Sequence, residues 1–218
     1  MNAPDGVYAR RFGERESAAK ERIWVPIARY LQRFVPESGA VIDIGADRGY
    51  FIRNIRAAEK WATDIRDTSA DMPADVRFEQ VDGLLVHESV PEDHFDTVFM
   101  SNYLEHLPSP DAVVAQLEAA RRIAKPGGSL LVLQPNIALV GAAYWDFIDH
   151  RVALTEHSLV EAAELAGWET ARVIRRFLPY TTKGRLPASP GLVRAYLAFR
   201  PAWWLLGGQT LYLGTRPA

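Results

Sequence analysis

Cysteine is absent from this chain of 218 residues. Its absence excludes disulfide bonds, zinc sites built on thiolates and a thiol nucleophile. Long apolar runs are missing too: no segment approaches the roughly 20 residues that span a bilayer, and the polar N-terminus has no apolar signal-peptide region. The length allows a sizeable core within one domain. These observations predict a soluble, cytoplasmic protein with a single domain, residues 1–218.

Acidic side chains are missing from the last part of the chain. After Glu169 there are eight basic residues and no acidic one, so the preceding part carries 17 basic against 27 acidic residues. This asymmetry indicates either an anionic partner for the C-terminal part or a solvated basic face. The eight basic residues are Arg172, Arg175, Arg176, Lys183, Arg185, Arg194, Arg200 and Arg216.

The stretch Val41–Phe51 predicts a buried strand, a tight glycine turn and a helix. The strand is rich in β-branched apolar residues, as in a parallel sheet. Gly45 permits a sharp turn and a close approach of a ligand, and a helix starting at Gly49 would direct free N–H groups toward that ligand. Such a turn is typical of a nucleotide site, although a strand and helix without any ligand is the alternative. The candidate binding residues are Asp43, Gly45, Ala46, Asp47 and Gly49.

Two more acidic residues stand at the ends of expected strands. Asp64, with Ile65 beside it, is placed where a carboxylate can accept hydrogen bonds from both hydroxyls of a ribose. Asp67 competes for this role. Asp82 and Gly83 follow the next strand, and a simple turn or helix cap is the alternative reading for each acid.

The segment Phe95–Leu107 reads F-D-x-V, then an apolar run, then L-E-H-L. It predicts a fourth strand with Ser101, Asn102 and His106 at or beyond its carboxyl end. A helix follows, and Lys125–Gly128 (K-P-G-G) is expected to end it as a glycine C-cap region before a fifth apolar strand.

These three motifs, in this order and spacing, resemble class I S-adenosylmethionine-dependent methyltransferases of the type 11 or 12 small-molecule group. The resemblance covers about residues 40–136, with Asp47 in place of the middle glycine of the family's first motif. It implies a Rossmann-like α/β fold: a mostly parallel seven-stranded sheet with helices on both faces and an antiparallel last strand. It also implies S-adenosylmethionine as the cofactor. The implied contacts are Asp82 and Gly83 at the adenine and Ser101 and Asn102 beside the sulfonium.

The coarse pattern of the chain agrees with that fold. One expected strand begins at Phe95, and the others occupy 41–44, 61–65, 76–81, 129–134, 168–177 and 209–214. The expected helices occupy 16–34, 49–58, 110–124, 155–166 and 192–199. We divide the domain into an N-terminal helical cap (1–38), a cofactor-binding core (39–136) and an acceptor-side region with the last two strands (137–218).

The region after residue 136 contains a dense aromatic and charged loop and then the basic tail. Its motifs resemble a subgroup of these methyltransferases found with bacterial surface-polysaccharide genes. We expect a saccharide or other small-molecule acceptor, anionic or lipid-linked, and peripheral contact of residues 195–206 with a membrane surface. The alternative is that Trp203 and Trp204 pack on the sheet and the arginines are solvated. The candidate acceptor residues are Tyr144, Trp145, Arg175, Arg176, Tyr180, Lys183 and Arg185.

Methyl transfer from a sulfonium needs positioning, and a hydroxyl acceptor also needs a base. His150 is the first candidate base, with Asp149 or Asp146 to orient it, and His106 is the second; a structural histidine is the alternative for both. No metal site is expected, because the five histidines include no H-x-x-x-H or H-x-H pair and there is no cysteine.

Three other functions compete with methyl transfer. A nicotinamide-dependent oxidoreductase would need the G-x-G-x-x-G fingerprint, which is absent, and Tyr180 and Lys183 are one residue too close for the short-chain reductase motif. A non-catalytic protein that binds S-adenosylmethionine stays open because of Asp47. A nucleic-acid methyltransferase would show N-P-P-Y or D-P-P-Y where this chain has Ser101–Leu104. The sequence therefore favours O-methylation of a small-molecule or saccharide acceptor.

Overall fold

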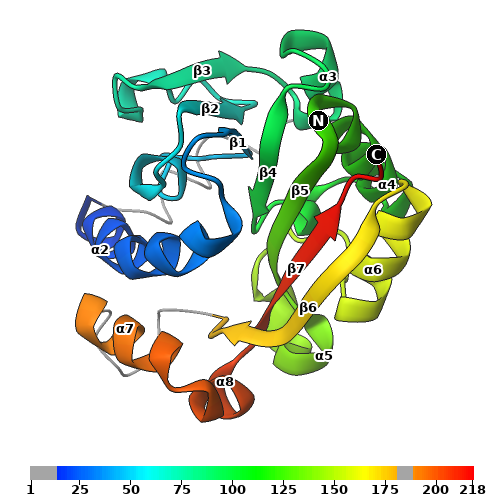
Figure 1. The fold of residues 1–218 in the computed structure, drawn as a ribbon. Coiled ribbons are helices and arrows are strands. Elements are labelled where there is room, and N and C mark those ends of the chain that lie inside the picture. Colours follow the sequence, from blue (N-terminus) through cyan, green and yellow to red (C-terminus); the bar gives the residue numbers. More distant parts are fainter. Residues whose placement is uncertain (1–13, 181–188) are drawn as a thin grey trace.

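A seven-stranded sheet forms the centre of the computed structural model, which describes residues 14–180 and 189–218 (Figure 1). The strands lie in the order β3-β2-β1-β4-β5-β7-β6. All neighbouring pairs are parallel except those of β7, which is antiparallel to β5 and β6. This topology confirms the predicted fold. The strands are β1 (Ala40–Ile44), β2 (Glu59–Asp64), β3 (Val76–Gln80), β4 (Phe95–Ser101), β5 (Ala124–Pro135), β6 (Glu169–Leu178) and β7 (Gln209–Thr215).

Strand β1 lies between β2 and β4 in the parallel part of the sheet, and all five of its residues are buried. Ile42 pairs in register with Trp61 of β2 and Val98 of β4. Apolar side chains pack in two clusters of buried residues, with Ile42 in one and Val41 in the other. Since neighbouring residues of a strand point to opposite faces, burial of both fixes the register. The carboxyl ends of β1, β2 and β4 are therefore held together at one edge.

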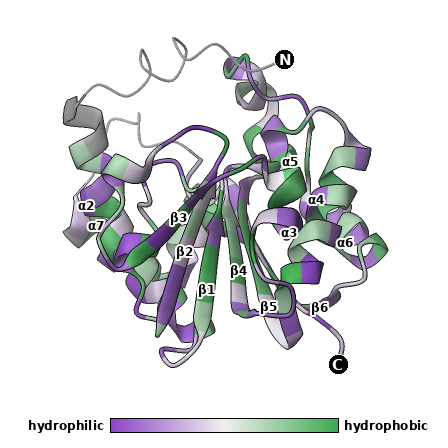
Figure 2. Cartoon of the chain, turned by 90° about the horizontal axis from the view of Figure 1, so that it is seen from above, coloured by the Kyte–Doolittle hydropathy of each residue, from purple (hydrophilic) through white to green (hydrophobic). Residues whose placement is uncertain are grey.

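Helices cover both faces of the sheet, as predicted (Figure 2). One side carries α2 and α7, and the other carries α3, α4 and α6. None of the helices in the described residues has the length and apolar character needed to cross a bilayer. The helices are α2 (Glu14–Leu31), α3 (Val86–Ser89), α4 (Pro110–Ile123), α5 (Ile137–Val140), α6 (Glu156–Leu165), α7 (Pro190–Ala198) and α8 (Arg200–Leu206). Short 3-10 turns are η1 (Gln32–Phe34), η2 (Ile52–Asn54), η3 (Ser69–Asp71), η4 (Gly83–Leu85), η5 (Leu104–His106) and η6 (Gly141–Asp146).

The helix predicted at 49–58 is wrong. Only the single turn η2 forms there, and the backbone is extended again at Ile55. The N–H of Ala58 donates to the carbonyl of Gly39, which starts the return into β2 at residue 59. Ile52 and Ile55 are buried, so their apolar signal comes from this packing and not from a helix.

The K-P-G-G segment also differs from its prediction as a helix C-cap. Helix α4 ends at Ile123, and Lys125–Gly128 already belongs to β5. The register with β4 shifts there, and Gly127 has φ +77° while its N–H donates to the carbonyl of Arg216. The two glycines thus belong to an irregular start of β5, which the sequence pattern alone does not predict.

Candidate active site

The glycine turn after β1 makes close contacts that explain its composition. Gly45 and Gly49 have φ of +69° and +67°, where side chains are strained. A Cβ on Gly45 would lie 2.4 Å from a ring carbon of Tyr103. The N–H groups of Gly45 and Ala46 both donate to the carbonyl of Thr63. The turn is therefore held against β2 by its own backbone, and the single turn η2 follows it in place of the expected helix.

Asp43 lies inside β1 with 3% of its surface exposed. Burial is the main reason that its pKa is raised well above the usual value, and the charges of Asp64 and Asp47 raise it further. A backbone hydrogen bond from Ile52 opposes this shift. Asp43 is thus a buried acid beneath the glycine turn, placed to hold the turn's shape.

Asp64 ends β2, and both of its carboxylate oxygens accept hydrogen bonds. Its Oδ2 accepts from the N–H of Asp47 at 2.9 Å, and its Oδ1 accepts from the N–H and Nε of Arg66 at 3.0 and 3.1 Å. A second guanidinium nitrogen of Arg66 donates to Oδ2 at 3.2 Å and to Asp47 Oδ1 at 2.9 Å. Asp47 has φ +50°. The sequence missed Arg66, which joins the residue replacing the family's middle glycine to the expected ribose acid.

The competing acid, Asp67, has a local role. Its Oδ1 accepts from the N–H and the hydroxyl of Ser69 at 3.0 and 2.6 Å, and this pairing lowers the pKa of Asp67. Ile65, between the two acids, exposes 53% of its surface. Asp64 contacts the glycine turn through the N–H of Asp47, and it stays the predicted ribose-binding acid.

Asp82 and Gly83 form the next corner of the site. Asp82 caps η4 by accepting from the N–H of Leu84 at 3.1 Å. A Cβ on Gly83 would lie 2.2 Å from the hydroxyl of Tyr103. That hydroxyl donates to Gln116 Oε1 at 2.8 Å, and burial raises the pKa of Tyr103. Tyr103, which the sequence did not single out, therefore fills the space between the glycine turn and η4.

The end of β4 supplies two polar side chains at the centre of the edge. Asn102 has φ +49°, and its N–H donates to the carbonyl of Leu133 in β5 at 2.8 Å. Its side-chain amide donates to Ser101 Oγ at 3.0 Å. Non-glycine residues with positive φ are uncommon and concentrate at functional sites. Ser101 and Asn102 lie side by side at the carboxyl end of β4, and their role in the site stays a prediction.

The two candidate bases lie together beyond the ends of β4 and β5. The ring centroids of His106 and His150 are 5.0 Å apart, and Phe147 stacks on His150 with centroids 5.1 Å apart. Asp149, expected to orient His150, contacts His106: its carbonyl oxygen and its Oδ2 lie 3.1 and 3.5 Å from His106 Nδ1. The structure thus brings both histidines and one aspartate into a single cluster.

Glu105 is a fourth member of this cluster, and the sequence analysis missed it. It is 1% exposed, and burial raises its pKa. Its carbonyl accepts from the N–H groups of Arg151 and Val152, which ties the loop of His150 to η5. Glu105, His106 and His150 each offer an atom of the kind that binds metals, all within 4.8 Å of one another. The prediction of no metal site rested on the spacing of residues within one segment, whereas this cluster joins two segments. The absence of a metal site stays a prediction.

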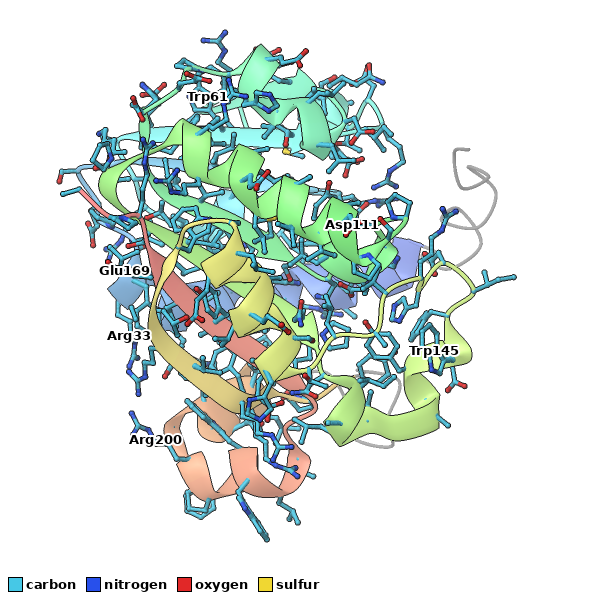
Figure 3. All side chains as sticks on the ribbon, turned by 90° about the vertical axis from the view of Figure 1, so that its right-hand side faces the viewer. Arg33, Trp61, Asp111, Trp145, Glu169 and Arg200 are labelled. Atoms are coloured by element: carbon cyan, nitrogen blue, oxygen red, sulfur yellow. The ribbon has the colours of Figure 1, made fainter. Side chains whose placement is uncertain are left out.

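The predicted acceptor residues are distributed unevenly. Tyr144 is fully buried and donates to the carbonyl of Val152 at 2.6 Å, so it supports the loop from within. Trp145 is half exposed and projects from the edge (Figure 3). Tyr180 donates to the carbonyl of Ala143 at 3.2 Å. Lys183 and Arg185 lie outside the described residues.

The two arginines of β6 that were predicted to bind the acceptor already have partners. Arg175 forms an ion pair with Glu156, whose carboxylate also accepts from Asn136 at 2.6 Å. Arg176 donates weakly to the carbonyl of Gly207 at 3.4 Å. Arg175 therefore supports the start of α6, and a role in holding an acceptor would require it to leave Glu156.

A family model described as a methyltransferase domain matches residues 18–173. The chain belongs to this methyltransferase family. The match confirms the class I S-adenosylmethionine-dependent methyltransferase predicted from the three motifs, and S-adenosylmethionine is the cofactor of that class. The residues present fit this cofactor: Gly45 and Gly83 leave no room for a Cβ beside Tyr103, Asp64 ends β2, and Asp82 follows β3.

Individual relatives are more distant. The methyltransferase is 28% identical over 159 residues to the ubiquinone biosynthesis O-methyltransferase of Xylella fastidiosa strain 9a5c. That alignment spans 64% of this chain and 62% of the relative, less than two thirds of its length. A chain in a Haloferax volcanii complex of a methyltransferase with its activator superposes with a TM-score of 0.69 at 18% identity, covering all of both chains. An Archaeoglobus fulgidus S-adenosylmethionine-dependent methyltransferase gives 0.62 at 18% identity, covering 98% of this chain and 100% of that one.

Proposed function

We propose that the methyltransferase transfers a methyl group from S-adenosylmethionine to a hydroxyl oxygen of a small-molecule acceptor, either a saccharide or a lipid-linked compound. The observation that carries this proposal is the pair of histidines at the carboxyl edge, with ring centroids 5.0 Å apart. Residues 39–136 would hold the cofactor and residues 137–218 the acceptor. The name of the Xylella relative, an O-methyltransferase, supports oxygen as the accepting atom, and a cytoplasmic location stays part of the proposal.

The cofactor, when bound, supplies a methyl group on a positively charged sulfur. The protein then has to align the acceptor oxygen with that methyl and remove the hydroxyl proton. An unprotonated ring nitrogen of His150 would take the proton of the acceptor hydroxyl as that oxygen receives the methyl group. Histidine suits this step because its ordinary pKa lies near 6.5. The carboxylate of Asp149, whose Oδ2 lies 3.5 Å from His106 Nδ1, would stabilise the positive charge that the cluster gains.

Substitution His150→Ala tests the role of the base. We expect turnover, followed as release of S-adenosylhomocysteine with a panel of hydroxylated saccharides and lipids, to fall about 10²- to 10⁴-fold. Cofactor affinity should stay nearly unchanged, because His150 lies in the loop beyond β5. His157→Ala is the matched control, since His157 lies on α6 with a side chain that is 92% exposed.

Three results would count against the proposal. Ordinary turnover in His150→Ala would make His150 structural and His106 the base to test next. Binding of S-adenosylhomocysteine by the unaltered protein, without turnover of any acceptor, would favour a non-catalytic binding protein. Binding of NADH without binding of S-adenosylhomocysteine would refute methyl transfer altogether.

A further inference from the structure

Four large apolar side chains are exposed within eight residues at α8. Phe199, Trp204, Leu205 and Leu206 expose 62%, 76%, 70% and 50% of their surface. We name these four residues the α8 patch. Single exposed apolar residues are ordinary on a protein surface, but a group of them marks a site of interaction.

The α8 patch stands on a firmly packed base. Trp203, the neighbour of the patch, is 6% exposed and packs on Tyr30 and Phe177 with ring centroids 5.7 and 5.3 Å apart. Its indole N–H donates to the carbonyl of Tyr196 at 2.8 Å. The alternative for the two tryptophans is thus half right: Trp203 belongs to the core, whereas Trp204 is held outside it.

The shape of the α8 patch favours a fluid partner over a flat one. Successive residues of a helix point about 100° apart, so Trp204, Leu205 and Leu206 extend over about 200° of the circumference of α8. One flat protein face would cover only part of that arc. Lipid chains and headgroups surround a projecting tip on all sides, and tryptophan prefers the boundary between them.

The charges around the α8 patch specify the kind of lipid. Arg194 on α7 and Arg200 on α8 are exposed, and Arg200 lies at the periphery of the molecule (Figure 3). Residues 170–218 contain no acidic side chain. Basic residues beside exposed aromatic and aliphatic ones match a surface that carries anionic headgroups.

The α8 patch lies at the same edge of the sheet as the histidine pair. Helix α8 leads through Gly208, whose N–H donates to the carbonyl of Leu178 and whose carbonyl accepts from the N–H of Asn136. Asn136 directly follows β5 and begins the segment that carries His150. Figure 1 shows α5, α7 and α8 on one side of the molecule, where β5 and β6 end and β7 begins.

We propose that the α8 patch docks the methyltransferase on an anionic lipid bilayer with the active-site edge near the headgroups. The evidence for docking is the α8 patch itself. Docking would bring the active site to a lipid-linked acceptor, and this second step rests on the proposed function. Binding to vesicles and turnover are separate measurements, so one can fail without the other.

Sedimentation with vesicles tests the docking. The full chain is mixed with vesicles of phosphatidylcholine alone or with about one third phosphatidylglycerol, in about 0.1 M and about 1 M salt. We expect binding to the anionic vesicles, and weaker binding at high salt, where the Debye length falls from about 10 to about 3 Å. The double variant Trp204→Ser, Leu205→Ser should lose at least about tenfold in partitioning. Because both side chains are already exposed, the variant should keep the circular-dichroism melt of the unaltered protein.

Leu165→Ser is the matched control, since Leu165 is 68% exposed on α6, outside the patch. It should bind vesicles like the unaltered protein, and Arg194→Gln with Arg200→Gln should lose the preference for anionic vesicles. Equal binding of the unaltered protein and the Trp204, Leu205 variant would overturn the proposal. So would absence of vesicle binding together with a concentration-dependent dimer, seen by light scattering and abolished in that variant, because the patch would then bind a second copy.

Discussion

The carboxylate of Asp64 accepts four hydrogen bonds, one from the backbone of Asp47 and three from Arg66. A carboxylate offers about four acceptor positions, so none is left over. The two guanidinium contacts, one to each oxygen, take the places that the two hydroxyls of a ribose would need. At the scale of single residues, the prediction that Asp64 binds the cofactor ribose therefore makes Arg66 a competitor of the ribose.

The first prediction at this scale compares the two acids after β2. Asp64→Ala should weaken binding of S-adenosylhomocysteine by about ten- to a hundredfold, since a charge-assisted hydrogen bond contributes about 1.5–3 kcal/mol. Asp67→Ala should change it little, because Asp67 is engaged with Ser69. Calorimetric titration measures both. A larger loss in Asp67→Ala would show that the ribose lies at Asp67.

The second prediction removes the competitor. Arg66→Ala should tighten binding of S-adenosylhomocysteine by about fivefold, because a partly exposed ion pair contributes at most about 1 kcal/mol. The gain should vanish in the Asp64→Ala background. Arg77→Ala is the control, since Arg77 pairs with Glu79 on β3 with a side chain that is 62% exposed. Weaker binding in Arg66→Ala would mean that Arg66 supports the cofactor.

At the scale of elements, helix α6 links the active-site loop to the sheet. Thr155 is its N-cap, and Thr155 and Ser158 bond each other's backbone N–H in a capping box. Just before this cap, the carbonyl of Leu154 accepts from the N–H of Ile137, so the two ends of the loop that carries His150 meet. The cap therefore stabilises the loop as well as the helix.

We predict that Thr155→Ala lowers the free energy of unfolding in urea by about 1 kcal/mol. Ser158→Ala added to it should cost little more, because both residues serve one motif and their effects are not additive. His157→Ala, on the exposed face, should change it by less than about 0.5 kcal/mol. Fully additive losses for Thr155 and Ser158 would show that the capping box is not one unit.

Elements were predictable where a local pattern is complete. Strand β1 is apolar except for Asp43, and Thr155 is an N-cap residue directly before α6, so both elements were expected from the sequence. The helix expected after Gly49 failed because its apolar residues serve packing under the sheet. Arg66 and Glu105 were missed because some of their contacts are distant in sequence. Arg66 joins Asp64 to Asp47, 19 residues away, and the carbonyl of Glu105 accepts from the N–H groups of Arg151 and Val152. Residue spacing does not encode such contacts.

At the scale of the whole molecule, buried acids link stability to pH. Asp43 has a raised pKa because of burial, so the folded state keeps a proton that the unfolded state releases above about pH 3.9. The stability that this proton contributes is complete below that pH and is lost as pH rises toward the folded pKa. The buried carboxyl therefore favours folding in acid and opposes it near neutrality.

We predict that Asp43→Asn becomes more stable relative to the unaltered protein as pH rises from about 4 to about 7. Urea unfolding at several pH values measures this difference. Asp67→Asn is the control with the opposite sign, since the pKa of Asp67 is lowered by Ser69 and its contribution is lost as pH falls. A difference for Asp43→Asn that does not vary with pH would contradict the raised pKa.

The antiparallel direction of β7 determines where a fusion partner or a sensor surface can be attached to the methyltransferase. The N–H of Arg216 donates to the carbonyl of Gly128, and Thr215 pairs with Ser129, so this end of β7 lies at the opposite edge of the sheet from His150. A fusion partner or a sensor surface joined after residue 218 would begin on that far edge. The histidine pair and the α8 patch would then stay open to solution, and an immobilised enzyme could still be offered acceptors and vesicles.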